Sequence, residues 1–80
     1  MSAAGAPPLV DARGLRCPWP LLRLARALRE APAALLVADD PATAGELAAL
    51  AALRGWQVAP AETTLGPAFR VARVAGRDAS

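Results

Sequence analysis

The sequence of 80 residues contains no histidine and only one cysteine, Cys17. Zinc, iron–sulfur and haem sites are built mainly from these two residue types, so we expect no metal site and no cofactor. A Ser-His-Asp triad or a Cys-His pair cannot form within the chain. With no second cysteine there is no internal disulfide and no resolving thiol, which excludes a disulfide-stapled secreted module and a Cys-x-x-Cys redox centre.

Basic residues are present only as arginine, nine of them against seven acidic residues, for a formal net charge of +2. The arginines are spread over a predicted loop, a predicted helix and the last predicted strand. Aromatic residues are scarce, since Trp19, Trp56 and Phe69 are the whole set. This pattern lacks the interleaved basic and aromatic platform of nucleic-acid-binding proteins. Direct nucleic-acid binding is therefore not expected, and the charges are interpreted as a solvated surface.

Apolar residues make up 55% of the chain, which is enough for the core of one small domain. We predict a flexible leader over residues 1–8, a single domain over 9–75 and a flexible tail over 76–80. The sequence shows neither a signal peptide nor an apolar run of membrane-spanning length. A cytoplasmic protein in a reducing compartment, without direct membrane contact, is expected.

Two stretches carry helical patterns. Between residues 18 and 30, Leu21, Leu24 and Leu28 recur at the spacing of one helix face, and Pro32 ends the pattern. The second helix is predicted over residues 41–54, with Asp40 as its N-cap and Gly55 directly after its last residue.

Four short apolar stretches are predicted as strands, over residues 9–12, 34–38, 56–58 and 68–74. Pro60 cannot donate to a sheet ladder, so it interrupts the third strand and places it at an edge. Each helix has a single apolar face, so both should lie on one face of the sheet. The predicted fold is a two-layer α/β sandwich of the α+β class, with a four-stranded mixed sheet and the order β-α-β-α-β-β.

The lone cysteine precedes two closely spaced prolines in the run Gly14-Leu15-Arg16-Cys17-Pro18-Trp19-Pro20-Leu21-Leu22. Proline is tolerated in the first turn of a helix, where its missing N–H has no intrahelical acceptor. We therefore predict Cys17 as the N-cap, Pro18 as the first helical residue and Pro20 as the third. The N–H groups of Trp19 and Leu21 and the helix dipole would then lower the pKa of the Cys17 thiol.

Neighbouring residues are expected to reinforce this setting. Arg13 and Arg16, in the preceding loop, should add positive potential. The two charges and the glycine of this loop also indicate that Cys17 is exposed. Trp19 is predicted to face a partner, because an exposed tryptophan is a typical interface anchor, whereas Trp56 is predicted in the core. Asp40 is interpreted as a helix cap rather than as an acid or base.

Two other interpretations stay open. Most free cysteines are buried small hydrophobic residues, so Cys17 could be structural in a small regulatory or nucleic-acid-binding interaction module. A redox sensor is a further alternative, although without a resolving cysteine it needs a thiol from a partner.

Two motifs together resemble those of the TusA/SirA family of sulfur-carrier proteins. They are Asp11-x-x-Gly14-Leu15-x-Cys17-Pro18-x-Pro20-Leu21-Leu22 and, further along, Ala38-Asp39-Asp40-Pro41-Ala42-Thr43. The resemblance extends from about Leu9 to Val74 and implies the same β-α-β-α-β-β sandwich. It also implies that Cys17 carries a persulfide, received from a cysteine desulfurase or a rhodanese-like donor. The sulfur would pass to a protein acceptor in tRNA thiolation, cofactor assembly or sulfur oxidation, so the protein would act only with partner enzymes.

The sequence departs from the family pattern at two places. Trp19 stands between the prolines, where some members have an acidic residue, and Ala31-Pro32-Ala33 replaces a Pro-Gly-Glu turn after the first helix. Both departures fall on surfaces that partners can contact. They leave open the donor, the acceptor, the pathway and the choice between sulfur and selenium as cargo.

Overall fold

A computed structural model describes residues 6–74 of the chain. The elements in chain order are β1 (Leu9–Asp11), α1 (Trp19–Glu30), β2 (Ala33–Val37), α2 (Thr43–Arg54), β3 (Gln57–Thr63) and β4 (Gly66–Ala72). The predicted order of elements is confirmed. Residues 1–5 of the predicted leader and the whole predicted tail, 76–80, lie outside the described residues. Neither described helix is long and apolar enough to cross a membrane.

The four strands form one mixed sheet in the order β1-β2-β4-β3. β1 and β2 are parallel, with Val10 beside Leu36, whereas β4 is antiparallel to both of its neighbours. β3 lies at an edge, as Pro60 predicts, because an edge strand can tolerate a missing N–H. Pro60 does not interrupt the strand, however, since β3 continues to Thr63 and pairs along its whole length with β4.

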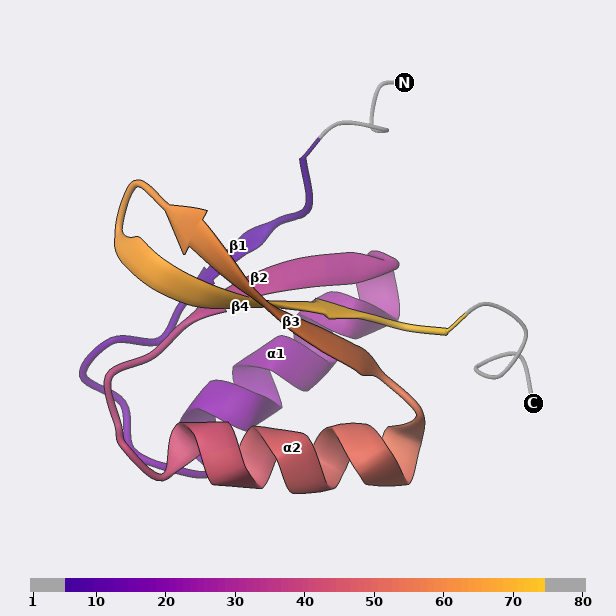
Figure 1. The fold of residues 1–80 in the computed structure, drawn as a ribbon, viewed down its shortest axis with the longest axis horizontal. Helices are drawn as coiled ribbons and strands as arrows, with labels where there is room; N and C mark the ends of the chain where they lie inside the picture. Colours follow the sequence, from indigo (N-terminus) through magenta and orange to yellow (C-terminus); the bar gives the residue numbers. More distant parts are fainter. Residues whose placement is uncertain (1–5, 75–80) are drawn as a thin grey trace.

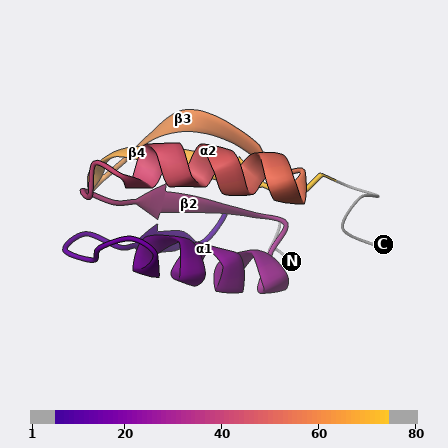
Figure 2. The same cartoon turned by 90° about the horizontal axis from the view of Figure 1, so that it is seen from below.

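Both helices lie on the same face of the sheet (Figure 1). Seen from that face, α1 lies over β1 and β2, and α2 lies on the β3 side (Figure 2). The core forms between the two layers. Its largest fully buried side chains are Leu24, Leu28, Leu36, Leu47, Val71 and Pro20. The predicted two-layer α+β sandwich is therefore confirmed.

The phase of α1 follows its apolar spacing. Leu21, Leu24 and Leu28 are buried, whereas Leu22 points outward and is 53% exposed. Residues at i, i+3 and i+7 lie on one face of a helix, and Trp19, two residues before Leu21, lies on the opposite face. Trp19 therefore points to the outside of the sandwich. The helix ends at Glu30, and the backbone of Ala31, the C-cap residue before Pro32, is extended.

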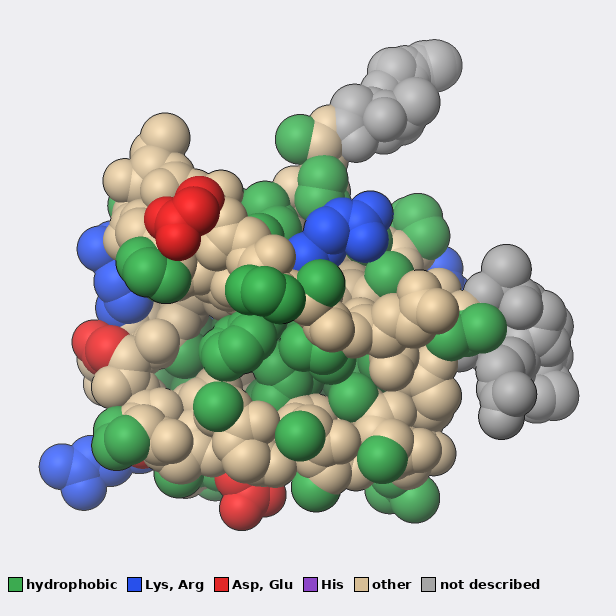
Figure 3. Space-filling model, viewed as in Figure 1, with side chains coloured by type: hydrophobic (Ala, Val, Ile, Leu, Met, Phe, Trp, Pro, Cys, Tyr) green, Lys and Arg blue, Asp and Glu red, His purple; other side chains and the backbone are tan. Residues whose placement is uncertain are grey.

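α2 ends as predicted but begins later. Gly55 terminates it in the left-handed conformation, with φ of 77°, and its N–H donates to the Ala51 carbonyl. The helix starts at Thr43, two residues after the predicted start at Pro41. Between β3 and α2 the sandwich is not fully closed, and hydrophobic side chains fill the hollow there (Figure 3). Trp56, predicted in the core, is half-buried and packs against the core. The centroid of its ring lies 5.7 Å from the Arg54 guanidinium carbon.

Candidate functional site

Two loops meet at one edge of the sheet and form the site. β1 and β2 are parallel, so the loops that follow them, 12–18 and 38–42, leave the sheet at the same end (Figure 1). A hydrogen bond holds the two loops together where they leave the sheet, because the Ala12 N–H donates to the Val37 carbonyl at 2.7 Å. This places the Cys17 motif and the Asp39-Asp40-Pro41 motif side by side.

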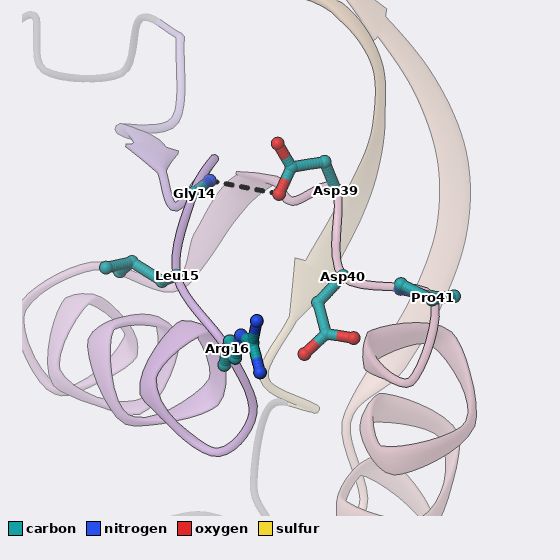
Figure 4. Close-up of a pocket in the computed structure, with 6 residues that line it drawn as sticks. All are labelled: Gly14, Leu15, Arg16, Asp39, Asp40 and Pro41. Atoms are coloured by element: carbon teal, nitrogen blue, oxygen red, sulfur yellow. Dashed lines mark hydrogen bonds between the residues drawn. The ribbon is translucent and has the colours of Figure 1, made fainter.

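Two adjacent aspartates tie these loops together. The Gly14 N–H donates to the Asp39 carboxylate at 2.9 Å (Figure 4). The Cys17 N–H donates to the Asp40 carboxylate at 2.8 Å. Each bond joins positions more than twenty residues apart in the sequence, so the conformation of the cysteine loop depends on the loop before α2.

An open hollow of about 340 Å³ lies where the loops meet (Figure 4). It is lined by Gly14, Leu15, Arg16, Asp39, Asp40 and Pro41. The Arg16 side chain extends toward the Asp40 carboxylate in this view, and its positive charge contributes to lowering the pKa of Asp40. Both signs of charge therefore border the hollow.

Asp40 holds the start of α2 in a different way from the one predicted. Its carboxylate accepts the Ala42 N–H at 3.0 Å, and its backbone carbonyl accepts the Thr43 N–H at 2.9 Å. The N-cap position itself falls on Ala42, so the prediction that Asp40 is the N-cap is wrong by two residues. Residues 41 and 42 form a turn that these two bonds close, and the helix begins only after it, while the other carboxylate oxygen of Asp40 accepts the Cys17 N–H. The hydrogen bond from the Ala42 N–H lowers the pKa of Asp40 most, and the bond from the Cys17 N–H lowers it further.

Cys17 itself is half-buried and packs against the hydrophobic core. The predicted N-cap role for Cys17 is wrong, because the helix begins at Trp19 and Pro18 occupies the N-cap position. The peptide bond between Cys17 and Pro18 is cis. Because the helix begins at Trp19, Pro20 is its second residue and not its third, and the Pro20 side chain is buried.

The amide groups expected to stabilise a thiolate have other partners. The Trp19 N–H donates to the Arg16 carbonyl at 2.8 Å. The Leu21 N–H donates to the Pro18 carbonyl at 3.1 Å. α1 has no side-chain hydrogen bond at its N-cap. The prediction that these two amides hold a Cys17 anion is therefore wrong.

The electrostatic setting of the thiol also differs from the prediction. Burial raises the pKa of the Cys17 thiol, and the carboxylates of Glu46 and Asp40 raise it further. A lowered pKa was predicted from the helix dipole, the Trp19 and Leu21 N–H groups and the two arginines of the preceding loop. Asp40 lies in the loop 38–42 and Glu46 lies in α2, so only the fold brings their carboxylates close to Cys17. The resting form at neutral pH is consequently the thiol.

The two arginines expected to support a thiolate face other groups. Arg13 binds Asp11 through two side-chain hydrogen bonds of 2.8 and 2.9 Å, and this pairing lowers the pKa of Asp11 to about 2. Arg16 acts on Asp40 instead. Neither arginine is among the charges that shift the pKa of Cys17.

Trp19 lies in the first turn of α1, with 59% of its surface exposed, as predicted. Among residues 6–74, no three Cys, Asp or Glu side chains cluster in a way that could hold a metal ion. The chemistry that the site offers is that of one half-buried thiol, beside aspartates and an exposed tryptophan.

Comparison with known families decides the class of protein. The family model described as Sulfurtransferase TusA matches residues 9–71, from the start of β1 into β4. The chain belongs to the TusA family. TusA proteins are sulfur carriers of the sulfurtransferase type that work in sulfur relays with protein partners. The matched segment contains the only cysteine and both loops of the site.

Proposed function

We propose that Cys17 accepts a sulfane sulfur from a protein donor, a cysteine desulfurase or a rhodanese, and passes it to a protein acceptor. One observation carries the proposal: the only cysteine of a TusA-family chain is partly exposed, in a loop held in place by Asp40. We further propose that residues 9–75 are the carrier domain and that it works in the cytoplasm. Candidate acceptors are the proteins of tRNA thiolation, cofactor assembly or sulfur oxidation.

The transfer is a sulfur exchange without net oxidation. The Cys17 sulfur, as thiolate, attacks the terminal sulfur of the donor persulfide. A new S–S bond forms at Cys17 while the S–S bond of the donor breaks, and the donor cysteine leaves as a thiolate. The proton lost from Cys17 balances the proton that the donor thiolate takes up. In release, a thiolate of the acceptor attacks the terminal sulfur of the Cys17 persulfide, and Cys17 leaves as the thiolate.

The surroundings of the thiol assign part of this chemistry to the partner. The Asp40 carboxylate is a weak base because its pKa is lowered by the two amides that it binds. The charges near Cys17 disfavour the thiolate. A docked donor must therefore accept the thiol proton or bring positive charge to the site, which fits a carrier that is inert until a partner binds.

Sulfur loading tests the proposal. The chain is incubated with a cysteine desulfurase and cysteine, and in parallel with a persulfidated rhodanese, and its intact mass is measured. The expected result is the gain of one or more sulfur atoms by the wild type and no gain by Cys17→Ser. A wild type that gains no sulfur from either donor would contradict the proposal.

Two further treatments of the chain, alkylation and exposure to peroxide, separate the other interpretations. A structural cysteine predicts that alkylation of Cys17 requires unfolding. A redox sensor predicts a stable mixed disulfide after peroxide treatment, without sulfur loading.

A further inference from the structure

The hydroxyl of Thr43, in the first turn of α2, is buried without a hydrogen-bond partner. Thr43 is 2% exposed, and among the described residues no group bonds to its Oγ1 atom. A buried hydroxyl without a partner costs free energy, so it calls for an explanation. The hydroxyl of Thr63 shows the usual arrangement, because it donates to the Gly66 carbonyl at 2.8 Å and accepts the Leu65 N–H at 3.1 Å.

Thr43 lies on the side of α2 that faces the cysteine. Asp40 accepts the Cys17 N–H with its carboxylate, at 2.8 Å, and the Thr43 N–H with its backbone carbonyl, at 2.9 Å. On the helix, Thr43 shares a face with Glu46 and Leu47, which follow it by three and four positions. Glu46 acts electrostatically on Cys17, and Leu47 belongs to the core against which Cys17 packs. The buried Thr43 hydroxyl is therefore directed toward the surroundings of Cys17.

A persulfide on Cys17 would bring a second sulfur into these surroundings. The terminal sulfur lies about 2 Å beyond the first, the length of an S–S bond. A persulfide is a stronger acid than a thiol, so the terminal sulfur carries negative charge at neutral pH. The carboxylates of Asp40 and Glu46 disfavour negative charge beside Cys17. The loaded form consequently needs a hydrogen-bond donor that the resting thiol does not need.

The backbone donors around the cysteine already have acceptors. The Cys17 N–H donates to the Asp40 carboxylate. The N–H groups of Trp19 and Leu21 donate to backbone carbonyls. Among these groups and the Thr43 hydroxyl, only the hydroxyl has no partner in the described residues.

We propose that the Thr43 hydroxyl donates a hydrogen bond to the terminal sulfur of the Cys17 persulfide and so holds the sulfur between donor and acceptor. The inference rests on the proposed carrier function, because it requires sulfur on Cys17. Thr43 is then a catalytic residue, since it touches the transferred atom. The N-terminus of α2 adds partial positive charge on the same side. A partner that comes only with the second sulfur explains why the hydroxyl is unpaired in the unloaded protein.

A buried water molecule is the competing partner for the Thr43 hydroxyl, since such waters often satisfy buried polar groups. A water would serve the loaded and the unloaded protein alike. It therefore predicts that removal of the hydroxyl leaves the hold on sulfur unchanged.

The test measures how sulfur divides at equilibrium between the chain and glutathione. Glutathione persulfide and the Cys17 thiol exchange to give the Cys17 persulfide and glutathione, with one S–S bond formed for each one broken. Alkylation followed by intact-mass measurement gives the exchange constant. Thr43→Val keeps the shape of the side chain and removes the hydroxyl, so it should lower this constant by about threefold to tenfold, the range for one hydrogen bond. Thr43→Ala, a second variant without the hydroxyl, should lower it as well.

Three controls separate the hydrogen bond from packing and folding. Thr43→Ser keeps the hydroxyl, and Thr63→Val removes a hydroxyl far from Cys17 in the sequence, so both should exchange within about twofold of wild type. Thr63→Val should lower the urea midpoint because it breaks two hydrogen bonds, whereas Thr43→Val should leave it unchanged or raise it. Alkylation of the unloaded Cys17 by iodoacetamide should stay within about twofold of wild type in Thr43→Val, because the resting sulfur has no bond to this hydroxyl.

The outcomes separate this inference from the carrier function. Equal exchange constants for wild type, Thr43→Val and Thr43→Ala would overturn the inference and leave the carrier function to the loading experiment with protein donors. A loss in Thr43→Ser as large as in Thr43→Val would also overturn it and assign the effect to packing. Exchange with glutathione persulfide, but no loading by a desulfurase or a rhodanese, would overturn the carrier function alone. A wild type that forms no persulfide from any of these sources would overturn both.

Discussion

The orientation of α1 can be tested by comparing two leucines on the same helix. Leu24 is fully buried, whereas Leu22, two positions earlier, is 53% exposed. Truncating a buried leucine to alanine costs about 2–5 kcal/mol, from lost burial and the cavity left behind. For a domain of this size the total stability is roughly 4–12 kcal/mol, so Leu24→Ala removes a large part of it. Leu22→Ala should change stability by about 0.5 kcal/mol or less.

The measurement is urea unfolding followed by far-ultraviolet circular dichroism, together with thermal melting. Leu24→Ala should lower the melting temperature by about 10 °C or more, and Leu22→Ala by a few degrees at most. Equal destabilisation by both variants would refute the assigned phase of α1. Because that phase also turns Trp19 outward, the exposed position of Trp19 would be contradicted as well.

Three further predictions follow from the charges and the glycines. Glu46→Gln removes a carboxylate that raises the pKa of Cys17, so iodoacetamide should alkylate the thiol faster at pH 7; a rate equal to or below that of wild type would contradict this. Gly45→Ala should stabilise α2 by about 0.5–1 kcal/mol, because the added carbon meets no atom, while Gly55→Ala, at positive φ, should destabilise by about 1–2 kcal/mol in urea titrations. The pKa of Asp40 is lowered in the folded state, so its contribution is present above its unfolded pKa of about 3.9 and is lost as pH falls through the folded value. The gap in urea midpoint between wild type and Asp40→Asn should therefore be larger at pH 7 than at pH 3, and a gap that grows on acidification would be the contrary result.

Local patterns in the sequence predict most of the fold. The spacing of Leu21, Leu24 and Leu28 gives the buried face of α1, and the outward position of Trp19 follows from the same spacing. Pro60 correctly indicates an edge strand, since a missing N–H is a property of the residue itself. Gly55 correctly marks the end of α2 for a similar reason.

The environment of the thiol could not be predicted in this way. It depends on Asp40 and Glu46, which are 23 and 29 positions from Cys17 in the sequence and approach it only after β1 and β2 pair in parallel. The prediction of a stabilised thiolate considered only residues close to Cys17 in the sequence, namely the helix start and the two arginines of the preceding loop. The Asp39-Asp40-Pro41 motif contained the missing signal, because both of its carboxylates bond to the cysteine loop.

The most direct test of the carrier account is whether sulfur on Cys17 both arrives and leaves. The chain is loaded by the donor in the presence of isotopically heavy cysteine, purified, and mixed with a second protein that presents a free acceptor thiol. The account predicts that the heavy sulfur appears on the acceptor as the mass of the chain returns to that of the free thiol, and that Cys17→Ser abolishes both events. Heavy sulfur that reaches the acceptor equally well with Cys17→Ser, or that never leaves the wild type for any sulfur-relay protein, would contradict it.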